Sequence, residues 1–230
     1  IFGRLLSKLY AKKQESNFKG WSWLMFWAFI THPLLDCHTT WGTQLFWPFE
    51  YRVAYNNIFV ADPIYTVPFL ICVVVVLFFR RENSKRKWIN NFGLIWSSSY
   101  MLLTLFFKWF AFEKFEDSLE EKKIQYSQMM TKPTPLNSLL WMANVKTDSN
   151  ALVGYYSLLD KNDDINFFKL PNENNLLGKI KDEEDFNRLV FLSKGYYSIS
   201  TRNDTILFND LRFGMMGFDE DAPVNFKYKM

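Results

Sequence analysis

A chain of 230 residues is long enough for one or two domains, and 19% of its residues are Phe, Trp or Tyr. Residues 1–112 carry 12 Lys and Arg against 5 Asp and Glu, whereas residues 113–230 carry 15 against 19. The basic residues of the first half cluster between apolar runs, which is typical of membrane flanks and argues against nucleic-acid binding. The two cysteines, Cys37 and Cys72, form no C-x-x-C pattern, which argues against a disulfide.

Residues 1–20 read as the end of a helix followed by a basic loop. The chain starts at Ile1, without a methionine, within this helical pattern. We therefore expect it to be a fragment that lacks an upstream membrane portion. The first apolar run, Trp21 to Leu35, is short for a full membrane span. Its end is predicted to open into a polar pocket.

The end of this run carries His32 and Asp36, which are four residues apart and project from one face of a helix. An imidazole and a carboxylate on one face can hold a divalent metal such as zinc. The alternative is a helix end with ordinary polar residues. The neighbouring Cys37 is either a small packing residue or a further soft ligand. His38, the other histidine of the chain, is a lesser candidate ligand.

The loop from Thr39 to Asp62 contains candidates for binding an anionic head group, namely Tyr51, Arg52 and Tyr55. The same residues also fit an interfacial aromatic belt with one snorkelling arginine. Asp62 precedes Pro63 and the second apolar run. It can cap that helix, ligate a metal, or do both, because Asp accepts from unpaired N–H groups and proline suits a first turn.

Two further apolar runs, Ile64–Phe79 and Phe92–Phe112, flank the strongly basic turn at residues 80–87. Short basic loops stay in the cytoplasm. If all three runs cross, the basic segments at 4–19 and 80–87 lie inside, and everything after residue 113 lies outside. The sequence thus predicts a multi-pass membrane protein with its C-terminal domain on the extracytoplasmic side.

The fold class predicted is an α-helical membrane domain of about three transmembrane helices (1–112) followed by a small extramembrane α+β domain (133–230). A charged helix, Glu113 to about Met130, and an extended linker at Thr131–Pro135 join them (113–132). Strands are predicted at Leu152–Leu158, Ile165–Leu170, Tyr196–Ser200, Thr205–Phe208 and Leu211–Phe213, with a hairpin turn at Asn203-Asp204 and a helix over Asp182–Leu192. Asp210 and Arg212 either form a structural ion pair or reach a phosphate.

Several segments resemble the YdjM-like inner-membrane proteins, a family described as membrane-bound metal-dependent hydrolases. The matching text is T-H-P-L-L-D at Thr31–Asp36, T-T-W-G-T at Thr39–Thr43, W-P-F at Trp47–Phe49, F-V-A-D-P-I-Y-T at Phe59–Thr66, P-T-P-L-N-S-L-L-W at Pro133–Trp141 and D-L-R-F-G at Asp210–Gly214. The H-x3-D pattern is also similar to part of the zinc site of zinc-dependent phospholipases C. One departure is the missing H-R-x-x-T-H-S motif that the family carries near its first membrane segments.

The resemblance implies a location in the bacterial inner membrane. It also implies a metal-dependent hydrolase of esters or phosphoesters, with membrane lipids as partners and a lipid or lipid-linked substrate. The metal ligands implied are His32 and Asp36, with His38 and Asp62 as lesser candidates and further ligands upstream of Ile1. The alternative is a non-enzymatic membrane scaffold or partner-binding envelope protein, in which His32 and Asp36 form a polar pair. A transporter is a weaker alternative, because no pair of broken helices is present in the sequence.

Overall fold

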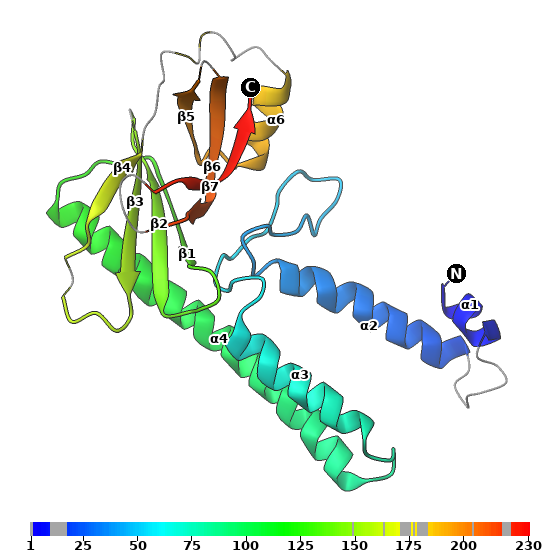
Figure 1. Cartoon of the computed structure of the whole chain (residues 1–230). Helices are drawn as coiled ribbons and strands as arrows, with labels where there is room; N and C mark the ends of the chain where they lie inside the picture. Colours follow the sequence, from blue (N-terminus) through cyan, green and yellow to red (C-terminus); the bar gives the residue numbers. More distant parts are fainter. Residues whose placement is uncertain are drawn as a thin grey trace. The chain divides into compact units, whose positions relative to one another are not determined.

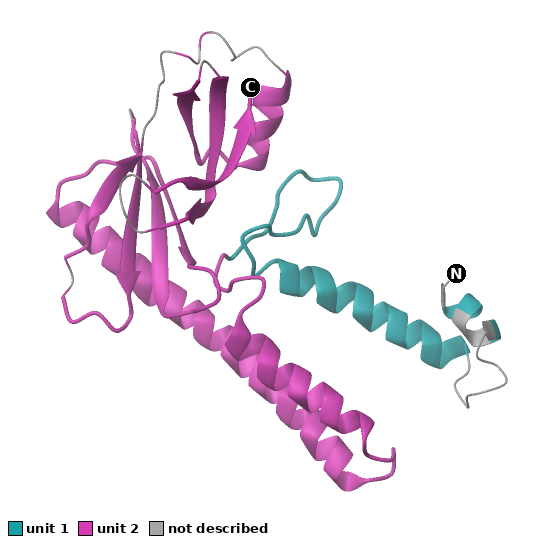
Figure 2. Ribbon diagram, in the orientation of Figure 1, with its two compact units in different colours: residues 1–55 teal, residues 56–230 magenta. Residues whose placement is uncertain are grey.

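The computed structural model describes residues 2–9, 18–148, 150–162, 164–170, 176, 178, 184–203, 205–217 and 222–230. The chain divides into two compact units, Ile1–Tyr55 and Asn56–Met230, which are coloured separately in Figure 2. Of the basic residues expected at 4–19, Lys12 and Lys13 lie outside the described ranges.

The first unit contains two helices, α1 (Phe2–Leu9) and α2 (Phe18–Asp36), and a loop that ends at Tyr55. The predicted helix over the first apolar run is confirmed, and α2 extends it by three residues at the start. None of the 19 residues of α2 is buried, although the helix is rich in tryptophan and phenylalanine. Its apolar side chains are therefore available to a medium or partner other than its own unit.

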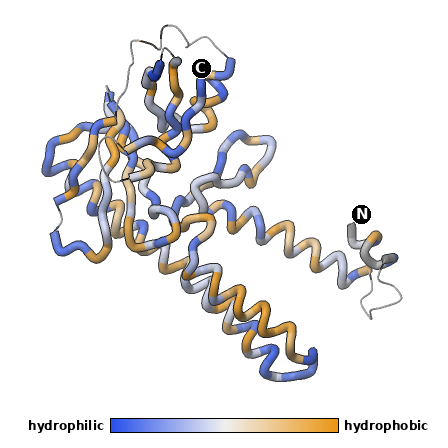
Figure 3. Tube along the Cα trace, in the orientation of Figure 1, coloured by the Kyte–Doolittle hydropathy of each residue, from blue (hydrophilic) through white to orange (hydrophobic). Residues whose placement is uncertain are grey.

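The second unit begins with a helical hairpin of α3 (Pro63–Leu77) and α4 (Ser84–Glu121), whose basic turn forms the tip (Figure 1). The two helices approach closely at Gly93, where an added Cβ would lie 2.9 Å from the Cβ of Cys72. The indole of Trp96 donates to the carbonyl of Ile64 at 3.1 Å. Most other large side chains of the hairpin stay exposed. Figure 3 shows long apolar stretches along both of its helices.

Among the helices that the structure describes, α4 alone is both long and apolar enough to cross a membrane. Its 38 residues correspond to about 57 Å. The apolar helix α3 has 15 residues, or about 22 Å. The prediction of three transmembrane helices is therefore not confirmed by length and composition, and it stays a prediction.

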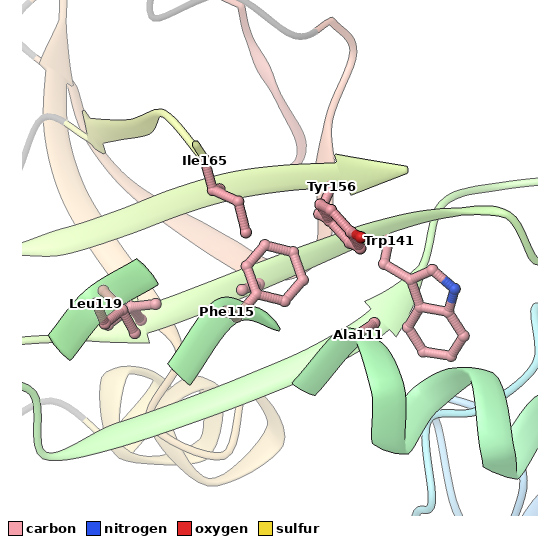
Figure 4. Packing of buried hydrophobic residues seen from close by; sticks show 8 residues of the cluster. Ala111, Phe115, Leu119, Trp141, Tyr156 and Ile165 are labelled. Atoms are coloured by element: carbon pink, nitrogen blue, oxygen red, sulfur yellow. The ribbon is translucent and has the colours of Figure 1, made fainter. Parts of the chain in front are cut away.

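The hairpin is followed by an antiparallel sheet of β1 (Gln128–Pro133), β2 (Leu140–Lys146), β3 (Ala151–Ser157) and β4 (Phe167–Leu170), in that order. Because side chains alternate along a strand, one face of this sheet presents Trp141, Ala143 and Val145 from β2. This face packs on Ala111, Phe115 and Leu119, which are spaced by four residues along α4 and are fully buried (Figure 4). One helix thus serves both the hairpin and the core of the sheet.

A second antiparallel sheet contains β5 (Tyr197–Arg202), β6 (Thr205–Met215) and β7 (Val224–Lys229), with β6 in the middle. The helix α6 (Glu184–Leu192) covers it through Phe186, which packs on Ile199 and Phe208. The other face of the first sheet meets β6, where the side-chain amide of Asn144 donates to the carbonyl of Leu211 at 2.8 Å.

The C-terminal half differs from the sequence prediction in five places. The helix predicted to Met130 ends at Glu121, because Lys123 takes a positive φ of 54° and the Ile124 N–H bonds the carbonyl of Leu119. The predicted linker at residues 131–135 mostly belongs to β1, the two short strands after residue 205 are one strand, and β2 and β7 were not predicted.

The other predicted elements of this half are found within one or two residues of their expected bounds. The strands at 152–158, 165–170 and 196–200 correspond to β3, β4 and β5. The helix predicted over 182–192 is α6, and residues 182 and 183 lie outside the described part of the chain. Asn203 has the positive φ, 48°, that suits a turn, while Asp204 also lies outside the described residues.

Candidate functional site

The structure brings His32 and Asp36 together at the end of α2, with 3.4 Å between Nε2 of the imidazole and a carboxylate oxygen. Their side chains are 79% and 44% exposed, so both can be reached from outside the helix. The helix continues through Pro33 to Asp36, which preserves the i, i+4 spacing. The predicted adjacency of the two side chains is therefore confirmed.

The residues just after α2 fold back on its last turn. Cys37 is buried, and its thiol donates to the carbonyl of Pro33 at 3.1 Å, which supports the packing interpretation of this cysteine. The His38 ring lies 5.2 Å from the ring of Tyr55, centroid to centroid. His38 is thus near Asp36 in sequence, and its ring is engaged by an aromatic neighbour.

The three predicted head-group residues lie on the loop that closes the first unit. Tyr51 and Arg52 are exposed, and Tyr55 is about half exposed while it contacts His38. The loop is anchored at its base, where the backbone N–H of Tyr55 donates to the carbonyl of Cys37 at 2.6 Å. The arrangement leaves both predicted uses open, head-group binding and an interfacial belt.

Asp62 belongs to the second unit and has a different environment, because only 1% of it is exposed. It caps α3, and one carboxylate oxygen accepts from the backbone N–H groups of Ile64 and Tyr65 at 2.9 and 3.1 Å. The other oxygen accepts from the Ser138 hydroxyl at 2.6 Å, and the Tyr100 hydroxyl lies 3.1 Å from both oxygens. The predicted capping role is confirmed.

Tyr100 and Ser138 were not recognised from the sequence as functional or structural partners of Asp62. Their two hydroxyl oxygens lie 2.5 Å apart, so the three side chains form one buried hydrogen-bonded cluster. A second buried contact nearby in the chain joins the Asn57 side-chain amide to the Thr104 hydroxyl at 2.8 Å. The available signals were polar residues within the apolar run of α4 and the serine of the P-L-N-S segment.

The predicted ion pair between Asp210 and Arg212 is confirmed in the second sheet. The guanidinium donates to both carboxylate oxygens, at 2.6 Å from Nη2 and 3.0 Å from Nε, and both residues are 2% exposed. Lys132, 5% exposed, faces the same cluster from β1, with its ammonium 5.5 Å from the ring centre of Phe213. Burial lowers the pKa of Lys132 to about 7, with Asp210 opposing the shift and Arg212 adding to it.

Across the ranges that the structure describes, no group of three or more His, Cys, Asp or Glu side chains is placed to hold a metal ion. The candidate site is therefore the two-residue arrangement of His32 and Asp36, which supplies one nitrogen and one oxygen donor. Zinc binds through such donors at bond lengths of about 2.0–2.2 Å. Two ligands of a tetrahedral site with these bonds lie about 3.3–3.6 Å apart, and the observed 3.4 Å fits that edge.

An apolar helical hairpin with one helix of spanning length, continued into an antiparallel sheet domain, is typical of a membrane protein with an extramembrane part. Residues 1–115 match the YdjM inner membrane protein family, which is half of the chain. The chain belongs to this family and is an inner membrane protein. No curated protein and no solved structure matches it.

Proposed function

We propose that this protein is a membrane-bound, metal-dependent hydrolase in which His32 and Asp36 hold a divalent cation, zinc by preference. The observation that supports the proposal is their 3.4 Å separation on an exposed face at the end of α2. The substrate proposed is an ester or phosphoester of a lipid or lipid-linked molecule, because the pair ends an aromatic-rich helix of an inner membrane protein.

Two residues make only part of a metal shell, so the proposal needs further ligands. His38 is the first protein candidate, since it follows Asp36 by two residues and has an imidazole. We do not count the predicted ligand Asp62 in this shell, because it belongs to the other compact unit and both of its oxygens already accept hydrogen bonds. A catalytic zinc site also keeps at least one position for water or substrate.

When bound, a divalent cation would lower the pKa of a coordinated water and so supply a nucleophile near neutral pH. The chain's own residues then have two main tasks: His32 and Asp36 hold the cation, and the exposed Arg52 is proposed to bind the anionic part of the substrate. A planar guanidinium suits phosphate and carboxylate groups through paired N–H donors. Tyr51 and Tyr55 are proposed to line the same approach.

The topology proposed is multi-pass, with α2, α3 and the apolar part of α4 crossing the inner membrane. The basic tip between α3 and α4 would then lie in the cytoplasm and the sheets outside. Alkaline phosphatase fused after Lys123 should be active, and a cytoplasmic fluorescent reporter at the same point should be silent. The reverse pattern would overturn this orientation.

The metal proposal is tested by metal analysis of the detergent-purified protein by mass spectrometry. His32→Ala removes the imidazole, and Asp36→Asn keeps the shape but removes the anionic oxygen. Both variants should lose most of the bound zinc or manganese while the protein still inserts. Cys37→Ser is the matched control and should keep its metal, because Cys37 packs against the helix end.

A second candidate function is a non-enzymatic scaffold or partner-binding protein of the envelope. The observation that favours it is α2 itself, none of whose residues is buried. A second membrane protein packed on that helix would cover its aromatic side chains, and the His32–Asp36 contact would then be a polar pair at a helix end. Equal metal in the wild type and both variants, or none after metal-replete purification, would support this candidate and contradict the hydrolase.

A further inference from the structure

The loop that follows α2 exposes a continuous run of aromatic side chains. All seven residues from 46 to 52 are exposed, including Phe46 at 62%, Trp47 at 82%, Phe49 at 70% and Tyr51 at 70%. Single exposed apolar residues are ordinary, but four large rings within six positions form a patch. Such a patch in water is costly unless something covers it.

The backbone of this loop is hydrogen-bonded within itself, so the exposed rings are presented by an ordered structure. At its base, Thr43 and Val53 exchange two backbone hydrogen bonds of 2.9 Å. Nearer the tip, the Gln44 amide donates to the carbonyl of Phe49 at 2.7 Å, and the Phe49 N–H donates to the carbonyl of Phe46 at 2.8 Å. Backbone groups paired in this way lower the cost of entering a medium that contains little water.

A close approach at the base of the loop depends on Gly42. Its φ is +66°, and an added Cβ would lie 2.5 Å from the carbonyl oxygen of Val53. A side chain at this position would therefore force the two arms of the loop apart. The pairing of Thr43 with Val53, which holds the loop closed, relies on this glycine.

We propose that the tip formed by residues 46–51 inserts into the boundary between head groups and acyl chains of the bilayer. The loop continues directly from α2 in a protein of an inner membrane family, so the covering medium nearest in the chain is lipid. Tryptophan and tyrosine combine an apolar ring with a polar atom and collect at this boundary. The exposed run from residue 46 to residue 52 carries one acidic and one basic residue, Glu50 and Arg52, and so has no net charge. We therefore attribute insertion to apolar contact and not to attraction by charged lipid.

Insertion of this loop anchors the polypeptide just beyond the His32–Asp36 pair at the membrane surface. The inference does not depend on metal binding or hydrolysis, because it rests on the exposure and internal bonding of the loop. A protein without bound metal should still insert the tip. Conversely, loss of insertion should leave the pair and its 3.4 Å contact in place.

The test uses the full chain in proteoliposomes of phosphatidylethanolamine and phosphatidylglycerol, with both native cysteines replaced by serine. Trp47→Cys carries an environment-sensitive fluorophore, and Arg202→Cys at the exposed end of β5 is the matched control. We expect the label at position 47 to lose emission to a nitroxide carried on the lipid near the carbonyl end of its acyl chain. It should resist iodide in the water, whereas the label at 202 should show the opposite behaviour.

Two results would overturn the proposal. Quenching of the label at 47 by iodide, as strong as at 202, would place the tip in water. Protection from both quenchers would mean that protein covers the tip. Phe49→Cys provides a second label site in the same patch if the Trp47→Cys protein is not recovered in the proteoliposomes. Metal content measured on the same preparations separates this test from the hydrolase proposal.

Discussion

The two units use their carboxylates in opposite ways. Asp36 in the first unit is 44% exposed and lies beside an imidazole that is 79% exposed. Asp62 in the second unit is 1% exposed and accepts from two backbone N–H groups and two hydroxyls, and Asp210 is equally enclosed by its arginine. A metal or substrate needs lone pairs that are not already committed. The difference therefore leaves Asp36 as the carboxylate that an outside ligand can reach, whereas Asp62 and Asp210 have structural roles.

The same contrast holds for the helices. No residue of α2 is buried, whereas α4 buries one stripe against α3 and a second stripe, at 111, 115 and 119, under the first sheet. Because α4 is continuous through both contacts, the apolar hairpin and the sheets share one rigid element. Substitution of buried residues in the second unit should therefore change the free energy of unfolding strongly, whereas substitution of exposed polar residues in the first unit should change it little.

The largest effect expected is from truncation within α4. A fragment of residues 131–230 lacks Phe115 and Leu119 and most of β1, so one face of the first sheet loses its cover. We expect this fragment to be molten or insoluble, and residues 110–230 to give a cooperative melt in water without detergent. A cooperative melt of the shorter fragment at the same temperature would show that α4 contributes nothing to the core.

The next largest effect is expected for Asp210→Ala. It leaves the buried guanidinium of Arg212 without its anionic partner and removes the carboxylate that favours protonated Lys132. The free energy of unfolding should fall by about 3–5 kcal/mol. Urea denaturation, followed by tryptophan fluorescence, measures the change. Adding Lys132→Met to the same chain should recover part of the loss, and no recovery would mean that Lys132 is not coupled to the pair.

A smaller loss, about 2–4 kcal/mol, is expected for Asp62→Ala, since it removes a helix cap and leaves the Ser138 and Tyr100 hydroxyls without their acceptor. Asp36→Ala is the control and should change stability by no more than about 0.5 kcal/mol. Thermal melts in detergent compare the two. Equal losses of stability in the two variants would contradict the difference between the buried Asp62 and the exposed Asp36.

The smallest change between neighbouring conditions is expected from Lys132, whose folded-state pKa of about 7 lies below its ordinary value. A single proton changes the free energy of unfolding by at most about 1.4 kcal/mol per pH unit. Between about pH 7 and 10 the unfolded chain binds a proton that the folded chain does not, so stability should rise with pH in this window. Below pH 7 both states are protonated and the rise should stop. Lys132→Met should flatten the curve and raise stability at pH 7, measured by urea denaturation at several pH values.

The sequence alone determined the features whose causes are local. Helices over the three apolar runs follow from composition, and the meeting of His32 with Asp36 follows from the helical repeat. The cap at Asp62 follows from an aspartate just before a proline, and the pairing of Asp210 with Arg212 follows from strand geometry, which puts alternate residues on one face. The resemblance to the YdjM-like proteins was likewise carried by short sequence segments that follow one another in a fixed order along the chain.

Tertiary structure decided what depends on residues far apart in the chain. The Ser138 hydroxyl donates to Asp62 from 76 positions further along the chain. Nothing in the sequence around Tyr100 predicts that its hydroxyl contacts the same carboxylate. Lys132 was predicted to lie in an extended linker, because its burial exists only once β1 pairs with β2 and the side chain faces Arg212 and Phe213 of β6. The start of β1 was missed for the same physical reason, because this strand forms by pairing with β2 and that pairing is not contained in local propensity.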